Sequence, residues 1–145
     1  GSRRAVKREK NMIVGIGSDI TNISRFERSI AAYGERLIDR ALGASEREEI
    51  AARQFVSPRE YAASVAKRFA AKEACSKALG TGFRNGIYLR DIQTVHNAAG
   101  KPELVLSGGA LQRLQKLSGG KNVNIQLTIS DDYPLAQAFV VIEVY

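Results

Sequence analysis

An acid and a base stand one helical turn apart in the stretch RFAAKEACSKALGTG, residues 68–82. Glu73 follows Phe69 by four residues and Lys77 follows Glu73 by four, so the three side chains would share one face of a helix. A carboxylate on an otherwise apolar stripe is costly when it is buried without a partner. A cation, hydrogen bonds or a metal ion must therefore compensate Glu73.

The spacing leaves two interpretations of Glu73 open. In the first, Glu73 and Lys77 form an ordinary ion pair along the helix, worth about 0.2–0.5 kcal/mol. In the second, Glu73 is one of two carboxylates that bind magnesium, and Asp19 in GIGSDI is the other. Magnesium takes one or two protein carboxylates and fills its remaining positions with waters and phosphate oxygens. Lys77 would then lie toward the phosphates, an arrangement that suits pyrophosphate chemistry.

Two elements near the N-terminus must position Asp19. The apolar run MIVGIG, residues 12–17, predicts a buried strand that delivers Asp19 to its end. Apolar residues at helical spacing after it predict a helix that is capped by Asn22 or Ser24 and ends at Gly34.

A long helix over residues 57–79 carries Glu73. Ser57 is suited to cap it, Pro58 fits its first turn, and Glu60 would complete a capping box. Gly80 ends the helix as a C-cap, which is the ordinary explanation of the Gly-Thr-Gly segment.

The second half of the chain alternates strand-like and turn-like stretches. It predicts two antiparallel hairpins and a short amphipathic helix between them: strands over 91–97 and 103–107, a helix over 107–120, and strands over 122–130 and 136–144. The fold class is therefore α+β, a largely antiparallel sheet with one long packed helix and shorter helices.

Composition limits the class of protein. The 145 residues, 44% hydrophobic, suffice for one core, so we expect a single domain over 12–145, preceded by a flexible leader over 1–11 that is a cloning remnant or precedes an alternative start. One cysteine and one histidine exclude a disulfide framework and a Cys/His zinc site within one chain. No long apolar segment or signal peptide occurs, so we expect a cytoplasmic protein without a membrane partner.

Three of these stretches together resemble the holo-[acyl-carrier-protein] synthases, the small bacterial 4′-phosphopantetheinyl transferases. They are GIGSDI with an arginine six residues after its aspartate, RFAAKEACSKALGTG, and NAAGKP at 97–102. The resemblance implies the phosphopantetheinyl transferase fold. It also implies an activity in fatty acid biosynthesis: transfer of 4′-phosphopantetheine from coenzyme A to a serine of apo acyl carrier protein, with release of adenosine 3′,5′-bisphosphate.

The same resemblance implies roles for individual residues. Asp19 and Glu73 would bind magnesium, or manganese in its place, and Lys77 would add positive charge at the pyrophosphate. Glu73, directly or through a metal-bound water, would accept the serine proton. The candidates for coenzyme A contacts are Arg68, Gly80, Gly82, Lys101 and Pro102. An ordinary turn explains the last two equally well.

The resemblance also implies two protein contacts. Arg25 and Arg28 lie three residues apart on the first predicted helix, on a face suited to docking the acidic carrier protein, although a solvated face is the simpler explanation. The family is typically trimeric, with each active site between two subunits, so we expect a homotrimer.

Three positions depart from or add to the family pattern. Asp131 stands near the position where many members have a histidine, and Cys75 stands where an aromatic residue is common. We expect Cys75 to pack as a small apolar residue and His96 to be structural.

Two other functions are consistent with parts of the sequence. A transferase for a dedicated carrier protein fits the same residues. A small basic nucleic-acid-binding domain fits the net charge of +7, but the leader carries five basic residues and one acid, which leaves 17 basic minus 14 acidic residues, or +3. We therefore expect no nucleic acid partner.

Overall fold

Antiparallel pairing joins the strands into two sheets, and the predicted α+β class is confirmed. The computed structural model describes residues 11–84 and 86–145, so the leader predicted over 1–11 lies outside the described residues except for Asn11. In chain order, the elements are β1 (Met12–Asn22), α1 (Ile23–Tyr33), α2 (Glu35–Ala41), α3 (Ala44–Ala52), α4 (Pro58–Leu79), the 3-10 turn η1 (Leu89–Asp91), β2 (Ile92–His96), β3 (Pro102–Leu106), α5 (Gly108–Ser118), β4 (Val123–Asp132) and β5 (Leu135–Val144).

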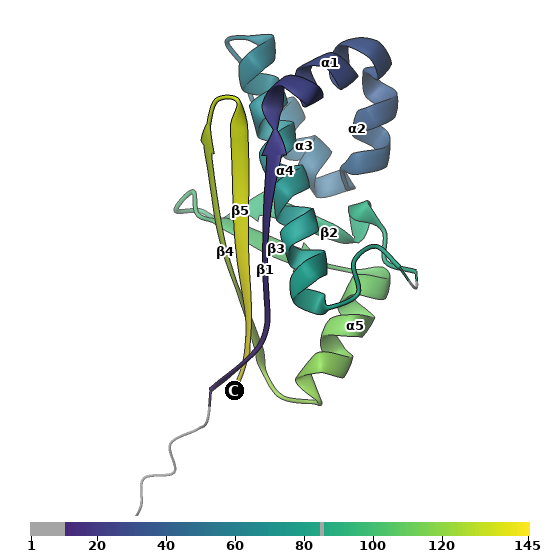
Figure 1. Cartoon of the computed structure of the whole chain (residues 1–145), viewed down its shortest axis with the longest axis vertical. Coiled ribbons are helices and arrows are strands. Elements are labelled where there is room, and N and C mark those ends of the chain that lie inside the picture. The colour runs from purple at the N-terminus through teal and green to yellow at the C-terminus, as the bar shows by residue number, and fades with distance from the viewer. Residues whose placement is uncertain (1–10, 85) are drawn as a thin grey trace, which may run out of the picture.

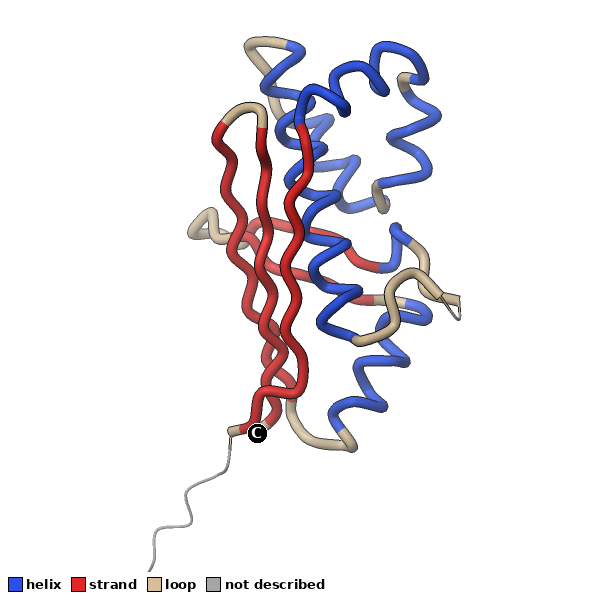
Figure 2. Tube along the Cα trace, viewed as in Figure 1, coloured by secondary structure: helices blue, strands red, loops and turns tan. Residues whose placement is uncertain are grey.

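The larger sheet has the strand order β1-β5-β4, and the hairpin β2-β3 forms the other sheet. Alternate β5 residues from Ala136 to Val144 are buried, since they face α4, which packs on β1 and β5. Figure 1 shows α1, α2 and α3 at one end of α4 and α5 at the other, and Figure 2 shows the helices gathered to one side of the three long strands. Within the described residues, no helix is long and apolar enough to cross a membrane.

The helix α4 begins and ends where its sequence signals place it. The Ser57 side chain accepts a hydrogen bond from the backbone N–H of Glu60 at 3.1 Å, and Gly80 adopts the left-handed conformation with φ +80°. The capping box is the one wrong detail, because the Glu60 carboxylate accepts from the backbone N–H of Val56 at 3.1 Å. The two hairpins, α1 and α5 are also confirmed, whereas α2 and α3 occupy a stretch for which the sequence analysis predicted no element.

The strand β1 corrects the prediction for residues 12–17. It does not end before Asp19 but continues to Asn22, and it is an edge strand whose Ile16 and Ile20 are 60% and 65% exposed. The reason is that Gly15 and Gly17 face α4, so the large apolar side chains of the strand alternate to the opposite side. Asp19, two residues beyond Gly17, lies within the strand and on the α4 side.

The contact between β1 and α4 leaves no room for side chains at these glycines. A Cβ at Gly15 would lie 2.1 Å from the carbonyl oxygen of Ala78, and a Cβ at Gly17 would lie 2.0 Å from that of Ala74. The strand therefore packs directly on the backbone of the helix.

Gly17→Ala should lower the free energy of unfolding by at least about 1–3 kcal/mol, because strand and helix must separate to admit the methyl group. Urea unfolding followed by circular dichroism measures the loss. Ser18→Ala is the matched control, since Ser18 is the exposed neighbour on the same strand. Equal stability of the two variants would contradict the packing argument.

Candidate active site

Asp19 and Lys77 meet where β1 crosses the C-terminal half of α4. The Lys77 ammonium lies 3.2 Å from the Asp19 carboxylate and donates to the backbone carbonyl of Ser18 at 2.9 Å. The Asp19 side chain is 17% exposed and that of Lys77 53%. Among the described residues, Lys77 thus pairs across to β1, and the ion pair with Glu73 along the helix, the first interpretation of the sequence, does not form.

Glu73 lies close enough to Asp19 for the two negative charges to interact. Burial raises the pKa of the Glu73 carboxyl, the Asp19 charge raises it further, and the Lys77 charge opposes both. The structure therefore brings together the three residues that the sequence predicted for the site. A cation placed near both carboxylates would relieve their repulsion.

The donor set at this place fits magnesium. Asp19 and Glu73 offer carboxylate oxygens, which are the ligands that hard cations prefer. No group of three or more His, Cys, Asp or Glu residues with metal-binding geometry occurs in the described part of the chain. The protein would thus supply two carboxylates, and waters and substrate phosphate oxygens would complete an octahedron.

A groove lies beside this cluster, at the outer edge of the sheet. It has a volume of about 370 Å³ and is lined by Ile16, Gly17, Ser18, Lys77 and Phe139. Its lining therefore combines the Lys77 side chain with two apolar side chains, Ile16 and Phe139, on the sheet face that points away from α4.

The loop after α4 holds two predicted coenzyme A contacts, Gly80 and Gly82. Both glycines have positive φ, +80° and +60°, and their N–H groups donate to the carbonyls of Lys77 and Ser76 at 3.0 and 3.2 Å. They therefore form the C-cap expected of such a loop. A contact with coenzyme A stays a prediction.

The other predicted contacts in the hairpin turn, Lys101 and Pro102, line a cavity of about 310 Å³ between β3 and β4. Lys101 donates to the Gln126 side chain at 3.4 Å. Since β4 and β1 are opposite edges of the larger sheet, this cavity and Asp19 lie on opposite sides of β5. The structure does not bring these two residues to the acidic cluster of the same chain.

Arg68, also predicted to contact coenzyme A, is buried with a side chain only 6% exposed, and it pairs with Glu49 on α3 at 3.2 Å. Glu49 further binds His96, accepting from its backbone N–H at 2.9 Å and lying 2.8 Å from its Nδ1. These bonds join α3, α4 and β2. The structure gives Arg68 and His96 places in the framework, and the contact of Arg68 with coenzyme A stays a prediction.

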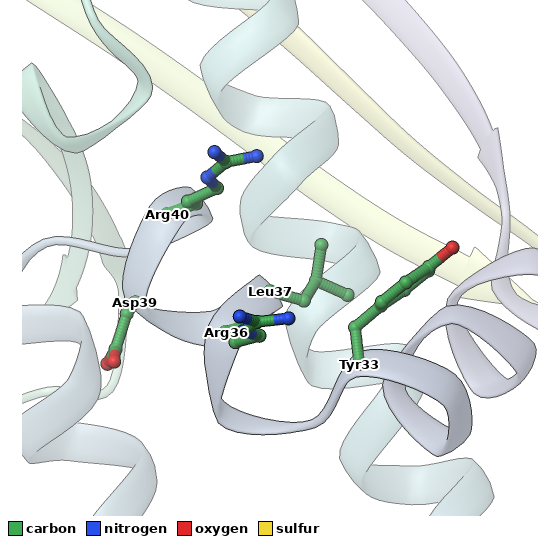
Figure 3. A pocket seen from close by; sticks show the side chains of 5 residues that line it. All are labelled: Tyr33, Arg36, Leu37, Asp39 and Arg40. Atoms are coloured by element: carbon green, nitrogen blue, oxygen red, sulfur yellow. The ribbon is translucent and has the colours of Figure 1, made fainter.

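Arg25 and Arg28 are exposed on α1, as predicted, while Phe26 between them packs on Phe69 of α4 with ring centroids 5.2 Å apart. Beyond them, a cavity of about 670 Å³ opens along α1 and α2, and it is lined by Tyr33, Arg36, Leu37, Asp39 and Arg40. Figure 3 shows the Leu37 and Tyr33 side chains on one side of it and Asp39 pointing away from them.

Two further residues occupy defined surroundings. Cys75 is fully buried, and burial raises the pKa of its thiol to about 12, which leaves an inert apolar residue. Asp131, near the position where the family resemblance led us to expect a histidine, pairs with Lys67 of α4 at 3.2 Å.

One arrangement of charged residues was not predicted, the α3–α4 charge ladder, in which Glu46 and Glu49 of α3 pair with Lys72 and Arg68 of α4. Lys72 and Glu46 form an ion pair in which neither side chain is exposed, and Arg68 and Glu49 form the second pair. The spacing, three residues apart on α3 and four apart on α4, places like charges on one face of each helix but does not show that the two faces meet.

Residues 15–138 match the model of the 4′-phosphopantetheinyl transferase superfamily. A holo-[acyl-carrier-protein] synthase from Brucella ovis is 52% identical over 133 residues, which cover 91% of this chain and 96% of that protein.

Solved structures agree with this match. The crystal structure of the Neisseria meningitidis holo-[acyl-carrier-protein] synthase is 38% identical, covers 90% of this chain and 98% of its own, and superposes with a TM-score of 0.74. A holo-(acyl-carrier-protein) synthase from Bacillus anthracis in complex with CoA (3′,5′-ADP) is 34% identical, with coverages of 92% and 99% and a TM-score of 0.71.

Proposed function

Because the chain belongs to the 4′-phosphopantetheinyl transferase superfamily, we propose that it uses magnesium, held by Asp19 and Glu73, to modify acyl carrier protein. It is a holo-[acyl-carrier-protein] synthase that moves 4′-phosphopantetheine from coenzyme A to a serine of apo acyl carrier protein, in fatty acid biosynthesis. We expect it to act in the cytoplasm.

One observation carries the magnesium proposal. The structure places two carboxylates, from β1 and α4, near each other, and the Lys77 ammonium lies 3.2 Å from one of them. The Lys77 ammonium therefore already lies beside the carboxylates, where a metal cation would also be attracted. Lys77 would turn toward the pyrophosphate when coenzyme A binds.

The transfer exchanges one phosphorus–oxygen bond for another. The serine oxygen bonds to the phosphorus that carries pantetheine, and the bond from that phosphorus to the bridging pyrophosphate oxygen breaks. The electron pair leaves with adenosine 3′,5′-bisphosphate, and the serine proton passes to the Glu73 carboxylate. Magnesium, when bound, would neutralise the charge that develops on the phosphate oxygens.

The surface of α1 and α2 supports docking of an acidic carrier. Arg25 and Arg28 are exposed, and the cavity of Figure 3 adds Arg36 and Arg40 beside an apolar surface. Among the described residues, none of these four arginines forms an ion pair. Cations near an apolar surface fit an acidic amphipathic helix.

The apolar face of the larger sheet supports a homotrimer with active sites between subunits. Ile16 and Ile20 are exposed there, and Phe139 and Val141 of β5 lie on the same face. The groove beside Lys77 is bounded by Ile16 and Phe139, so a neighbour covering this face would close one wall of the site. It would also explain why Lys101 and Pro102 lie away from Asp19 within one chain.

Glu73→Gln should lower turnover by about 10²–10⁴-fold, because the amide neither accepts the serine proton nor balances the metal charge. Intact mass spectrometry of apo acyl carrier protein incubated with coenzyme A and magnesium measures the gain of one phosphopantetheine group. The wild type should show the gain, and a chelator should abolish it.

Glu48→Gln on α3 is the matched control, since Glu48 is exposed and outside the site. Full activity of Glu73→Gln with unchanged metal dependence would overturn the two-carboxylate proposal. Modification of a different carrier protein alone would instead indicate a dedicated partner.

Charge reversal on α1, Arg25→Glu with Arg28→Glu, should raise KM for the carrier at least roughly tenfold at low salt and leave kcat nearly unchanged, since steering charges act on encounter. Initial rates across a salt series check this, because added salt should reduce the difference in KM between the variant and the wild type. Lys116→Glu on α5 is the control. An unaltered KM would remove the docking proposal.

Ile16→Lys with Ile20→Lys should convert trimers to monomers, because charges would be buried in the subunit contact. Light scattering after size-exclusion chromatography gives the mass. Val56→Lys, at a loop residue that is 90% exposed, is the control and should stay trimeric. A monomeric wild type, or a variant that keeps its trimer, would refute the assembly.

A further inference from the structure

The buried half of the α3–α4 charge ladder lies directly beside the active-site helix face. Glu46 and Lys72 are both 0% exposed. The Lys72 ammonium donates to the Glu46 carboxylate, to the backbone carbonyl of Ile92, and to that of Leu89 at 3.0 Å. All three donors of the ammonium are therefore used, and each partner comes from outside α4.

Glu46 is equally well bonded. Its carboxylate accepts from the backbone N–H of Gly43 and from that of Thr94, each at 3.1 Å. The Thr94 N–H lies on the edge of β2 that β3 does not pair, so the carboxylate takes the place of a neighbouring strand. One ion pair thus connects α3, η1, β2 and α4.

Stability alone does not account for such a pair. Two apolar side chains of similar volume would fill the same space without the cost of dehydrating two charges. The pair instead fixes the orientation of the Lys72 side chain, because three hydrogen bonds restrict its direction more tightly than apolar packing would.

The direction matters because Lys72 immediately precedes Glu73. Successive helical side chains point about 100° apart, so Lys72 faces α3 and β2 while Glu73 faces β1. The glycine contacts of β1 set how close the strand lies to α4, and the Lys72 hydrogen bonds hold a different face of the same helix. A rotation of about 10° moves a side chain at the helix surface by about 1 Å.

We propose that Lys72 is a positioning residue: its buried, triply bonded ammonium sets the rotation of α4 that brings Glu73 and Lys77 to Asp19. This inference rests on the proposed function of Glu73 and Asp19. Lys72 touches neither substrate and acts through its neighbour.

The test removes the charges together, so that no unpaired ion stays in the core. Lys72→Met with Glu46→Gln should fold cooperatively, yet bind Mn²⁺ at least tenfold more weakly and lose about 10²-fold in kcat, as expected for a displacement near 1 Å. KM for the carrier should not change. Titration with Mn²⁺ followed by electron paramagnetic resonance gives the affinity, and calorimetry shows whether the variant unfolds cooperatively. Initial rates give kcat and KM.

A second double variant, Lys72→Gln with Glu46→Gln, keeps hydrogen-bonding groups without charge. It should recover part of both Mn²⁺ affinity and kcat, and it carries the test if the methionine variant does not fold. Ile50→Ala, a buried apolar change on α3, is the control for loss of stability and should leave Mn²⁺ affinity unchanged.

Wild-type Mn²⁺ affinity and kcat in a folded double variant would overturn the positioning role while the proposed function stands. Equal losses in Ile50→Ala would also overturn it, because a general loss of stability would then explain the weaker Mn²⁺ binding and the slower turnover. Failure of the wild type to bind Mn²⁺ or to modify the carrier would overturn the proposed function and, with it, this inference.

Discussion

The missing side chains of Gly15 and Gly17 are the constraint on which the site depends. Any Cβ at these positions would meet a carbonyl oxygen of α4 at about 2 Å, so only glycine lets an edge strand touch the helix backbone. Because side chains alternate along a strand, the next residue on the same side is Asp19. The carboxylate therefore reaches α4 at the level of Glu73 and Lys77 without belonging to the helix.

The helix α4 separates its charges by face. Toward β1 it carries Glu73 and Lys77, which are partly exposed. Toward α3 it carries Arg68 and Lys72, which are buried and already paired. Burial separates the charges that hold the framework from the charges of the proposed site better than residue type does, since all four side chains come from a stretch of ten residues.

Local signals sufficed for much of the fold. The caps at Ser57 and Gly80 predicted both ends of α4, and alternation with turn residues predicted both hairpins. The predictions failed where the answer lay in a partner distant in sequence. The run 12–17 is apolar enough for a central strand, but Ile16 is exposed because it lies on the sheet face that α4 does not cover. Lys77 pairs with Asp19, 58 residues away, and Glu46 with Lys72, 26 residues away, and no periodicity encodes such contacts.

The pairing of β1 with β5 has a consequence for how the chain could be reconnected. Met12 lies opposite Val144, so the first strand begins where the last strand ends. Figure 1 shows this point at the end of the sheet far from α1. A short linker from Tyr145 to Met12, with new termini opened in the exposed turn at Gly119 and Gly120, would preserve every strand pair. The order in which the elements are synthesised is thus separable from the arrangement that brings Asp19 to α4.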